Sequence, residues 1–273
     1  MSSANDRSDS TEIAERITRT ISEGSTATLV TLIRAESNVG AKLFVEKGLE
    51  VFGSLGSQEL NEAVAGRVRS FLESRADMLV VDLREFAPEL GDIAGTQLLF
   101  ERIQREPRLV ICGAGHVGAA LANLATLLGY QSTVIDDRQE FVERERFPDP
   151  RIELVAAADW AEAVRRSVSD GRGVSVVVVT RGHSEDEVCL KAVMKTGADY
   201  VGLIGSKRRT RIVLDRLRET GINPEMLERV HAPIGLDIGA VTPEEVALAI
   251  MAEIVAVRRG GNGRSLSVKR QRR

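Results

Sequence analysis

Three glycines between residues 113 and 118 have the spacing of a turn that binds phosphate groups. Gly113 permits a tight turn, Gly115 lets the backbone approach a diphosphate, and Gly118 allows a helix to pack closely on a strand. An apolar segment precedes the turn and a helix-forming segment follows it, so free N–H groups at the start of a helix would face the ligand. This arrangement predicts a nucleotide-binding βαβ unit over residues 108–138.

An acidic pair, Asp136 and Asp137, ends the next expected strand, about twenty residues after the turn. In proteins with this unit, a carboxylate at that point holds a ribose hydroxyl. Arg138 follows the pair and is assigned to the same site. A Rossmann domain that has lost its ligand is the alternative, and the spacing alone leaves it open.

Three further groups of polar residues follow later expected strands, at the edge where ligands of doubly wound sheets sit. We treat each group as a candidate part of one ligand site. The groups are residues 180–186 with Thr180, His183 and Asp186, residues 205–209 with Gly205, Ser206, Lys207 and Arg208, and residues 231–239 with His231 and Asp237.

The chemistry of these groups has two interpretations. The cations at 207–209 open an expected helix, where positive charge is unfavourable to the helix dipole, so a bound phosphate would explain them. A solvated run of charge is the alternative. His183 and His231 could exchange protons near neutral pH, whereas a structural hydrogen bond is the alternative for a single histidine in a loop.

Strands and helices alternate regularly through the second half of the chain, and this alternation must position the loops. Residues 174–179 are apolar on both faces, which is typical of a parallel sheet covered by helices on each side. Thr242, Pro243 and Glu245 predict a capping box at the start of the last helix. We expect an α/β fold with a doubly wound Rossmann domain over residues 106–259.

The first half has a different pattern, with short β-branched runs separated by Gly and Asn. Such runs predict antiparallel strands, and apolar residues at every fourth position within 58–75 predict a helix. We therefore expect a smaller mixed α+β domain over residues 13–105. Residues 1–12 and the basic tail, 260–273, are expected to be disordered.

Composition narrows the function classes. The formal net charge of −3 gives no reason to expect nucleic acid as a ligand. Apolar runs are too short to cross a bilayer, and residues 1–17 resemble neither a signal peptide nor a transit peptide, so we expect the cytoplasm. The two cysteines, Cys112 in a strand and Cys189 in a helix, indicate buried thiols and no disulfide framework.

The motifs of the second half, in their order and spacing, resemble the XdhC and CoxI family, the accessory factors of xanthine dehydrogenase and related molybdenum hydroxylases. The resemblance runs from Arg108 to Arg258. Its motifs are GAGHVG at 113–118, VIDDR at 134–138 with Glu140 and Phe147-Pro148, T-x-G-H-x-x-D at 180–186, YVGLIGSKRR at 200–209 and HAPIGLDIGAVTPEEVALAIMAEI at 231–254.

Several positions depart from the family pattern. Arg181 stands where the family usually has histidine. In the first half, residues 36–39 replace a G-S-x-P-R stretch. The family's glycine pair, cysteine and glutamate are replaced by Ser57, Gln58, Glu59 and Asn61. These losses argue against sulfur handling by this domain and indicate a divergent member.

The resemblance implies a cytoplasmic, dimeric helper that binds the molybdenum cofactor, protects it during sulfuration and hands it to an apo-hydroxylase. A cysteine desulfurase is a further implied partner. The form of the cofactor, molybdopterin or one of its dinucleotides, stays open, and no catalytic residue or metal ligand is assigned. Taken together, the motifs and the resemblance assign cofactor binding to Gly113, Gly115, His116, Gly118, Asp136, Asp137, Arg138, Thr180, His183, Asp186, Gly205, Ser206, Lys207, Arg208, His231 and Asp237.

Two other functions stay open. In an NAD(P)-dependent oxidoreductase, the glycine turn and Asp136 would bind the nucleotide, and His183 or His231 would be the acid or base. A nucleotide-sensing regulatory module would use the same turn without chemistry. Because a phosphorylated pterin and NAD both present phosphate groups, the spacing alone does not separate them.

Overall fold

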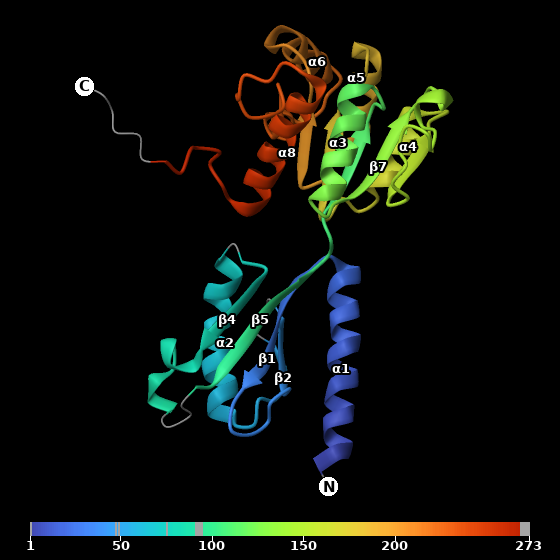
Figure 1. Ribbon diagram of the computed structural model, residues 1–273. Helices are drawn as coiled ribbons and strands as arrows, with labels where there is room; N and C mark the ends of the chain where they lie inside the picture. Colours follow the sequence, from blue (N-terminus) through green and yellow to red (C-terminus); the bar gives the residue numbers. More distant parts are fainter. Residues whose placement is uncertain (1, 47, 49, 75, 91–94, 268–273) are drawn as a thin grey trace, which may run out of the picture. The chain divides into compact units, whose positions relative to one another are not determined.

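The computed structural model describes residues 2–46, 48, 50–74, 76–90 and 95–267. It divides into two compact units, Met1–Arg105 and Glu106–Arg273, which are coloured blue to green and green to red in Figure 1. None of the described helices is both long enough and apolar enough to cross a membrane.

The first unit is an antiparallel sheet with one helix on each face (Figure 1). Val30 and Phe100 of the sheet pack with Val64 of helix α2, whereas Ala27 and Phe44 pack with Ile13 of helix α1 on the other face. The strands lie in the order β3-β2-β1-β5-β4. The elements are α1 (Ser2–Glu23), β1 (Thr26–Arg34), β2 (Lys42–Glu46), β3 (Val51–Gly53), α2 (Gln58–Glu73), β4 (Met78–Asp82) and β5 (Gln97–Gln104), with short 3₁₀ helices at Leu83–Glu85 and Pro88–Leu90.

The start of the chain differs from the expectation of disorder over residues 1–12. Helix α1 begins at Ser2 and continues without interruption to Glu23. No glycine or proline interrupts the segment, so nothing in its backbone chemistry stops the helix from extending toward the N-terminus. At the other end, residues 268–273 of the expected basic tail lie outside the described residues.

The second unit is a six-stranded parallel sheet in the order β11-β10-β9-β6-β7-β8. The chain runs outward from β6 to one edge, returns to the centre and runs outward again, so the winding reverses between β6 and β9. The elements are β6 (Arg108–Cys112), α3 (His116–Leu127), β7 (Gln131–Asp136), β8 (Ile152–Ala156), α4 (Trp160–Val168), β9 (Val174–Val178), α5 (His183–Val193), β10 (Tyr200–Leu203), α6 (Lys207–Glu219), α7 (Pro224–Glu228), β11 (Val230–His231) and α8 (Pro243–Arg259). The predicted fold class, an α/β chain with a doubly wound second half, is confirmed.

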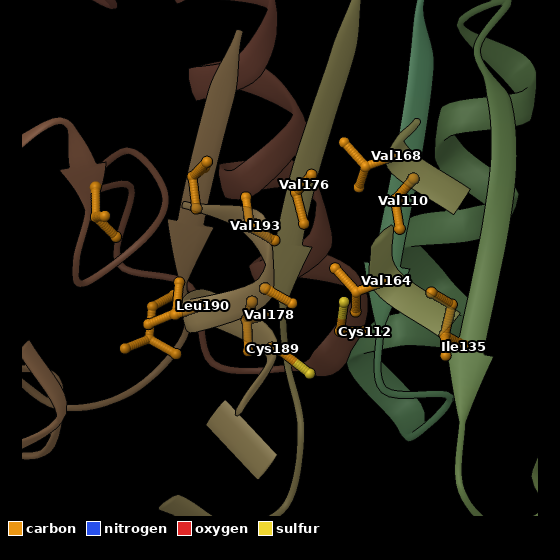
Figure 2. Packing of buried hydrophobic residues seen from close by; sticks show 14 of the residues in the cluster. Val110, Cys112, Ile135, Val164, Val168, Val176, Val178, Cys189, Leu190 and Val193 are labelled. Carbon is orange, nitrogen blue, oxygen red and sulfur yellow. The ribbon is translucent and has the colours of Figure 1, made fainter. Parts of the chain in front are cut away.

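Alternate side chains of the central strands enter two separate cores. Leu109 and Ile111 of β6 pack against α3 and α8, while Val110 and Cys112 face α4 and α5. Figure 2 shows this second core, in which Cys112 and Cys189 lie among valines. Both thiols are free and buried, as the sequence predicted. Burying both faces of the sheet in this way holds the carboxyl ends of the strands at one rigid edge.

The start of the last helix agrees with the sequence. Thr242 caps α8, and Glu245 completes the predicted capping box. Between β7 and β8 the chain forms a single 3₁₀ turn, Gln139–Phe141. Helix α7, which the hydrophobic pattern did not predict, is a short helix whose start is capped by Asn223.

Candidate functional site

The glycine turn lies at the carboxyl end of β6, at the point where the winding of the sheet reverses. Gly113 has a φ of +121°, and a Cβ there would lie 2.5 Å from the carbonyl oxygen of Val179. A Cβ on Gly118 would lie 1.9 Å from the carbonyl oxygen of Gly113. Both positions therefore require glycine for reasons internal to the fold.

Gly115 has no such internal reason to be glycine. Its φ of −66° and ψ of −172° suit any residue. A Cβ built on it would meet no heavy atom within 4 Å. The space beside Gly115 is therefore open, and the absence of a side chain keeps it open.

Helix α3 begins at this turn without a side-chain cap. Gly115 is its N-cap residue, and its first turn contains no acidic residue. The first N–H groups of an uncapped helix carry partial positive charge and lack intrahelical partners. By contrast, side-chain oxygens cap α2, α4, α6, α7 and α8, through Ser57, Asp159, Ser206, Asn223 and Thr242. Helix α5 also follows a glycine without a side-chain cap, but its first turn contains the acidic residues Glu185 and Asp186. The start of α3 can therefore receive an anion.

Asp136 is an internal support of the glycine turn. Its carboxylate is 1% exposed and accepts a hydrogen bond of 2.8 Å from the N–H of Ala114. The backbone N–H of Arg138 donates to it at 3.0 Å, and the guanidinium of Arg138 donates twice, at 2.8 and 2.9 Å. These four bonds use the acceptor capacity of the carboxylate. Asp136, expected to hold a ribose hydroxyl, has no free oxygen for one.

The ionisation of Asp136 stabilises the fold. Burial opposes the charge, but hydrogen bonds from Arg138 and Ala114 outweigh it, and the pKa of Asp136 lies below its ordinary value. Because the folded-state pKa is the lower one, this stabilisation is complete above the unfolded pKa and is lost as the pH falls through the folded pKa.

Replacing Asp136 by asparagine is expected to lower the unfolding free energy at pH 7 by about 2–3 kcal/mol, because the charge-assisted bonds are lost. The acid limb of the stability profile should also become flatter. Urea unfolding followed by the fluorescence of Trp160, the only tryptophan in the chain, measures both effects in the second unit. Asp237→Asn, at an exposed loop position, is the control and should leave stability at pH 7 unchanged. An unchanged profile for Asp136→Asn would contradict the assignment.

Asp137 lies beside Asp136 but has a different environment. Its side chain is 32% exposed, and its Oδ2 is 3.0 Å from Nη2 of Arg181, whose side chain is 53% exposed. Asp137 follows β7 and Arg181 follows β9, so this ion pair joins the two loops on either side of β6. Sequence reasoning marked Arg181 only as a departure from a family pattern and did not predict its partner.

Thr180 and Asp186 form a buried cluster with Arg209. The carboxylate of Asp186 is fully buried and accepts bonds of 2.6 Å from Thr180 Oγ1 and from Arg209 Nη2. Burial raises the pKa of Asp186, and the two hydrogen bonds oppose that rise. The cluster ties the loop after β9 to the start of α6. Arg209 therefore stabilises the fold. Thr180 and Asp186, which were expected to contact a ligand, bond to each other and to Arg209 instead.

Four other candidate site residues are exposed: His116, His183, Lys207 and Arg208. Lys207 and Arg208 open α6 and have no ion-pair partner among the described residues. His116 and His183 are the first residues of α3 and α5, each after a glycine N-cap, and the strands before them, β6 and β9, are neighbours. The fold thus brings His116, His183, Arg208 and Lys207 to the same edge as the glycine turn.

His231 belongs to a separate cluster centred on Glu253, which sequence reasoning missed. The Tyr200 hydroxyl donates a bond of 2.5 Å to Glu253 Oε2, and the N–H of Gly235 donates to the same oxygen at 3.0 Å. His231 stacks on the Tyr200 ring with centroids 4.5 Å apart, and its Nδ1 is 3.6 Å from Glu253. Burial and this carboxylate raise the pKa of Tyr200. The cluster anchors the loop after β11, which carries the exposed Asp237, onto α8.

The signal for Glu253 was a single acidic residue in an otherwise apolar stretch of the last helix. A carboxylate in such a stretch needs a buried partner, because an unpaired charge there is costly. No three side chains of His, Cys, Asp or Glu gather as metal ligands within the described ranges.

A doubly wound parallel sheet with a glycine turn at its switch point has the architecture of a Rossmann domain. A family model described as the XdhC Rossmann domain matches residues 109–254, more than half of the chain. The chain belongs to the XdhC family, and the resemblance predicted from the motifs is confirmed.

Three curated relatives are similar to this chain. YqeB of Escherichia coli K12, described as uncharacterized, is 32% identical over 227 residues, which are 82% of this chain and 41% of that protein. A protein of Bacillus subtilis described as a probable subunit of xanthine dehydrogenase is 31% identical over 60% of this chain and 47% of that protein. The molybdenum cofactor insertion chaperone PaoD of Escherichia coli is 26% identical over 55% of this chain and 40% of that protein. This chain spans less than half the length of each relative.

One solved structure supports the fold over most of the chain. A crystal structure described as a xanthine dehydrogenase from Bacillus halodurans superposes with a TM-score of 0.64 at 22% identity, covering 91% of this chain and 67% of that chain. At this identity the likeness concerns the fold, and it includes the first unit as well as the Rossmann domain.

Proposed function

We propose that this protein is an accessory factor of a molybdenum hydroxylase and binds the phosphate end of the molybdenum cofactor at its glycine turn. Membership of the XdhC family supports the class. Two relatives, one named for xanthine dehydrogenase and the other as a molybdenum cofactor insertion chaperone, support the choice of enzyme and cofactor. The apo-hydroxylase, a cysteine desulfurase and a second copy of the chain are the proposed partners.

The open space at Gly115 is the observation that carries the proposal. Because neither backbone conformation nor neighbouring atoms require glycine there, the cradle that a Cβ would fill suits an incoming phosphate. The first N–H groups of α3 would donate to it, and Lys207 and Arg208 would supply positive charge. The cofactor would supply redox chemistry at molybdenum in the client enzyme, whereas this chain would bind it, orient it and shield it.

The oxidoreductase alternative has weaker support in this geometry. Its ribose contact, Asp136, is saturated by internal hydrogen bonds. One of its two candidate proton-transfer residues, His231, is stacked on Tyr200 and directed to Glu253. We therefore expect no saturable NADH or NADPH binding in calorimetry at millimolar nucleotide. Saturable binding with hydride transfer to a carbonyl compound would favour the oxidoreductase instead.

Replacing Gly115 by serine separates binding from stability. Serine is a better N-cap residue than glycine by about a few tenths of a kcal/mol, so the unfolding free energy should rise by roughly that amount. Its side chain would fill the cradle and compete for the N–H groups, so affinity for the cofactor should fall at least ~tenfold, or about 1.4 kcal/mol. Retained pterin fluorescence after gel filtration measures binding, and Trp160 fluorescence in urea measures stability.

The control for this substitution is Gly66→Ala. Gly66 lies on helix α2 of the first unit, and a Cβ there also meets no atom within 4 Å. Its substitution should leave cofactor retention unchanged. Equal retention by Gly115→Ser and wild type would remove the glycine turn as the binding site, and no retention by wild type would remove the proposed function.

A further inference from the structure

The glycine turn is held from both sides by the loops that follow the neighbouring strands. On one side, the backbone of Val179 lies so close to Gly113 that no Cβ fits between them. On the other side, Asp136 accepts a hydrogen bond from Ala114. Slightly further along the same two loops, Arg181 and Asp137 meet in an ion pair of 3.0 Å. The pair therefore spans the carboxyl end of β6, beside the cradle of the turn.

This ion pair is weak enough to open. Both side chains are substantially exposed, and exposed pairs contribute about 0–1 kcal/mol. One donor of the Arg181 guanidinium is used by Asp137, and a guanidinium has further donors that suit two phosphate oxygens at once. Arg181 is thus a cation at the site whose present partner can be replaced at little cost.

The surrounding charges favour such an exchange. The Nε of Arg138 is 4.0 Å from Asp137 Oδ1, so Asp137 keeps a second cation nearby when Arg181 leaves. Glu185, the other acidic neighbour of Arg181, is held by its own backbone N–H and by Ser184, and its pKa lies below its ordinary value. Asp137, in contrast, places a negative charge beside the point where a phosphate would enter, and this charge repels the phosphate.

We propose that Arg181 is the residue that selects an anionic ligand at this site, and that it exchanges Asp137 for a ligand phosphate when the ligand binds. The inference rests on the proposed function, since it concerns the same cradle at Gly115. Asp137 then acts as an internal competitor: it holds Arg181 at the mouth of the site and lowers the affinity for anions.

The two partners should therefore have opposite effects on binding. Asp137→Asn releases Arg181 and removes a repulsive charge, so affinity for a phosphate ligand should rise about three- to tenfold. Arg181→Ala removes the cation and should lower affinity about tenfold or more. Arg181→Lys should restore part of this loss, and the salt dependence of binding should be shallower in Arg181→Ala than in wild type.

The experiment is calorimetric titration of the full chain with inorganic pyrophosphate and with molybdopterin, at two ionic strengths. Glu187→Gln is the matched control, because Glu187 and Arg216 form an ion pair of 2.8 Å with similar exposures, 29% and 57%, between α5 and α6. It should bind both probes as wild type does. Trp160 fluorescence checks that each variant is folded.

The outcomes separate the two proposals. Tighter binding by Asp137→Asn and weaker binding by Arg181→Ala support the exchange. If Asp137→Asn binds as wild type does or more weakly, the exchange is overturned while the proposed function stands. If neither probe binds to wild type or to Asp137→Asn, the site is not an anion site and both proposals are overturned.

Discussion

Replacement of Arg209 by alanine is expected to lower the unfolding free energy of the second unit by about 3–5 kcal/mol, because it leaves the buried carboxylate of Asp186 without its cation. Asp186 is fully buried, and Thr180 alone would remain as its partner. A buried charge with one hydroxyl donor is poorly compensated. The measurement is urea unfolding at pH 7 followed by Trp160 fluorescence.

The pH dependence of this effect has a definite sign. Burial already raises the pKa of Asp186 in the native protein, and removal of Arg209 should raise it further. A carboxyl with a raised folded-state pKa favours folding below its unfolded pKa, and this contribution is lost as the pH rises through the folded pKa. The destabilisation by Arg209→Ala should therefore be greatest at neutral pH and above and smaller at acid pH.

Arg208→Ala is the matched control for Arg209→Ala. Arg208 is exposed beside Arg209 and has no ion-pair partner among the described residues. Its replacement should change stability by less than about 0.5 kcal/mol. Asp186→Asn combined with Arg209→Ala should recover part of the loss, since the buried charge is then gone. A loss below about 1 kcal/mol for Arg209→Ala would show that Asp186 does not depend on this cation.

Replacement of Gly118 by alanine should cost about 3 kcal/mol, at the upper end of the range for overpacking. The new Cβ would lie 1.9 Å from the carbonyl oxygen of Gly113, a backbone atom that cannot rotate away. Relief requires helix α3 to move from β6, which also opens the packing of Leu121 and Ala125 in the core. Unfolding by urea with Trp160 fluorescence is again the measurement.

The control for Gly118→Ala is Gly115→Ser, three positions earlier in the same turn. Gly115 has open space around its Cα and an ordinary φ, so its variant should be at least as stable as wild type. The two glycines of this motif should therefore have different roles: Gly118 is needed for folding and Gly115 for binding. Similar stabilities for the two variants would argue against this division.

The fold was predictable because its signals are local. Runs that are apolar on both faces, such as residues 174–178, indicate parallel strands that are buried on both sides, and every residue of β9 is in fact buried. The capping box at Thr242 marks a helix start through four consecutive residues. Such patterns depend on backbone geometry within a few residues, so no knowledge of distant contacts is needed.

The roles of individual site residues were less predictable, because they depend on partners far away in the sequence. Nothing in an Asp-Asp pair tells which carboxylate turns inward, yet Asp136 is buried and Asp137 is exposed. The run of cations at 207–209 looks like one feature, but Arg209 pairs with Asp186 while its two neighbours stay exposed. Glu253 was overlooked because its partners, Tyr200 and His231, lie on different strands.

The sequence by itself determined the alternating architecture, the glycine turn at the end of β6 and, through its ordered motifs, the XdhC family. These follow from periodicity and from residues whose conformational needs are local. Only the tertiary structure decided which charged side chains support the fold and which face the open edge, because desolvation and pairing act between residues that the chain brings together from separate strands. The carboxylates of Asp136 and Asp186 are buried and stabilise the fold through internal hydrogen bonds. Gly115, Asp137 and Arg181 lie at the open edge of the sheet, where we propose that the ligand binds.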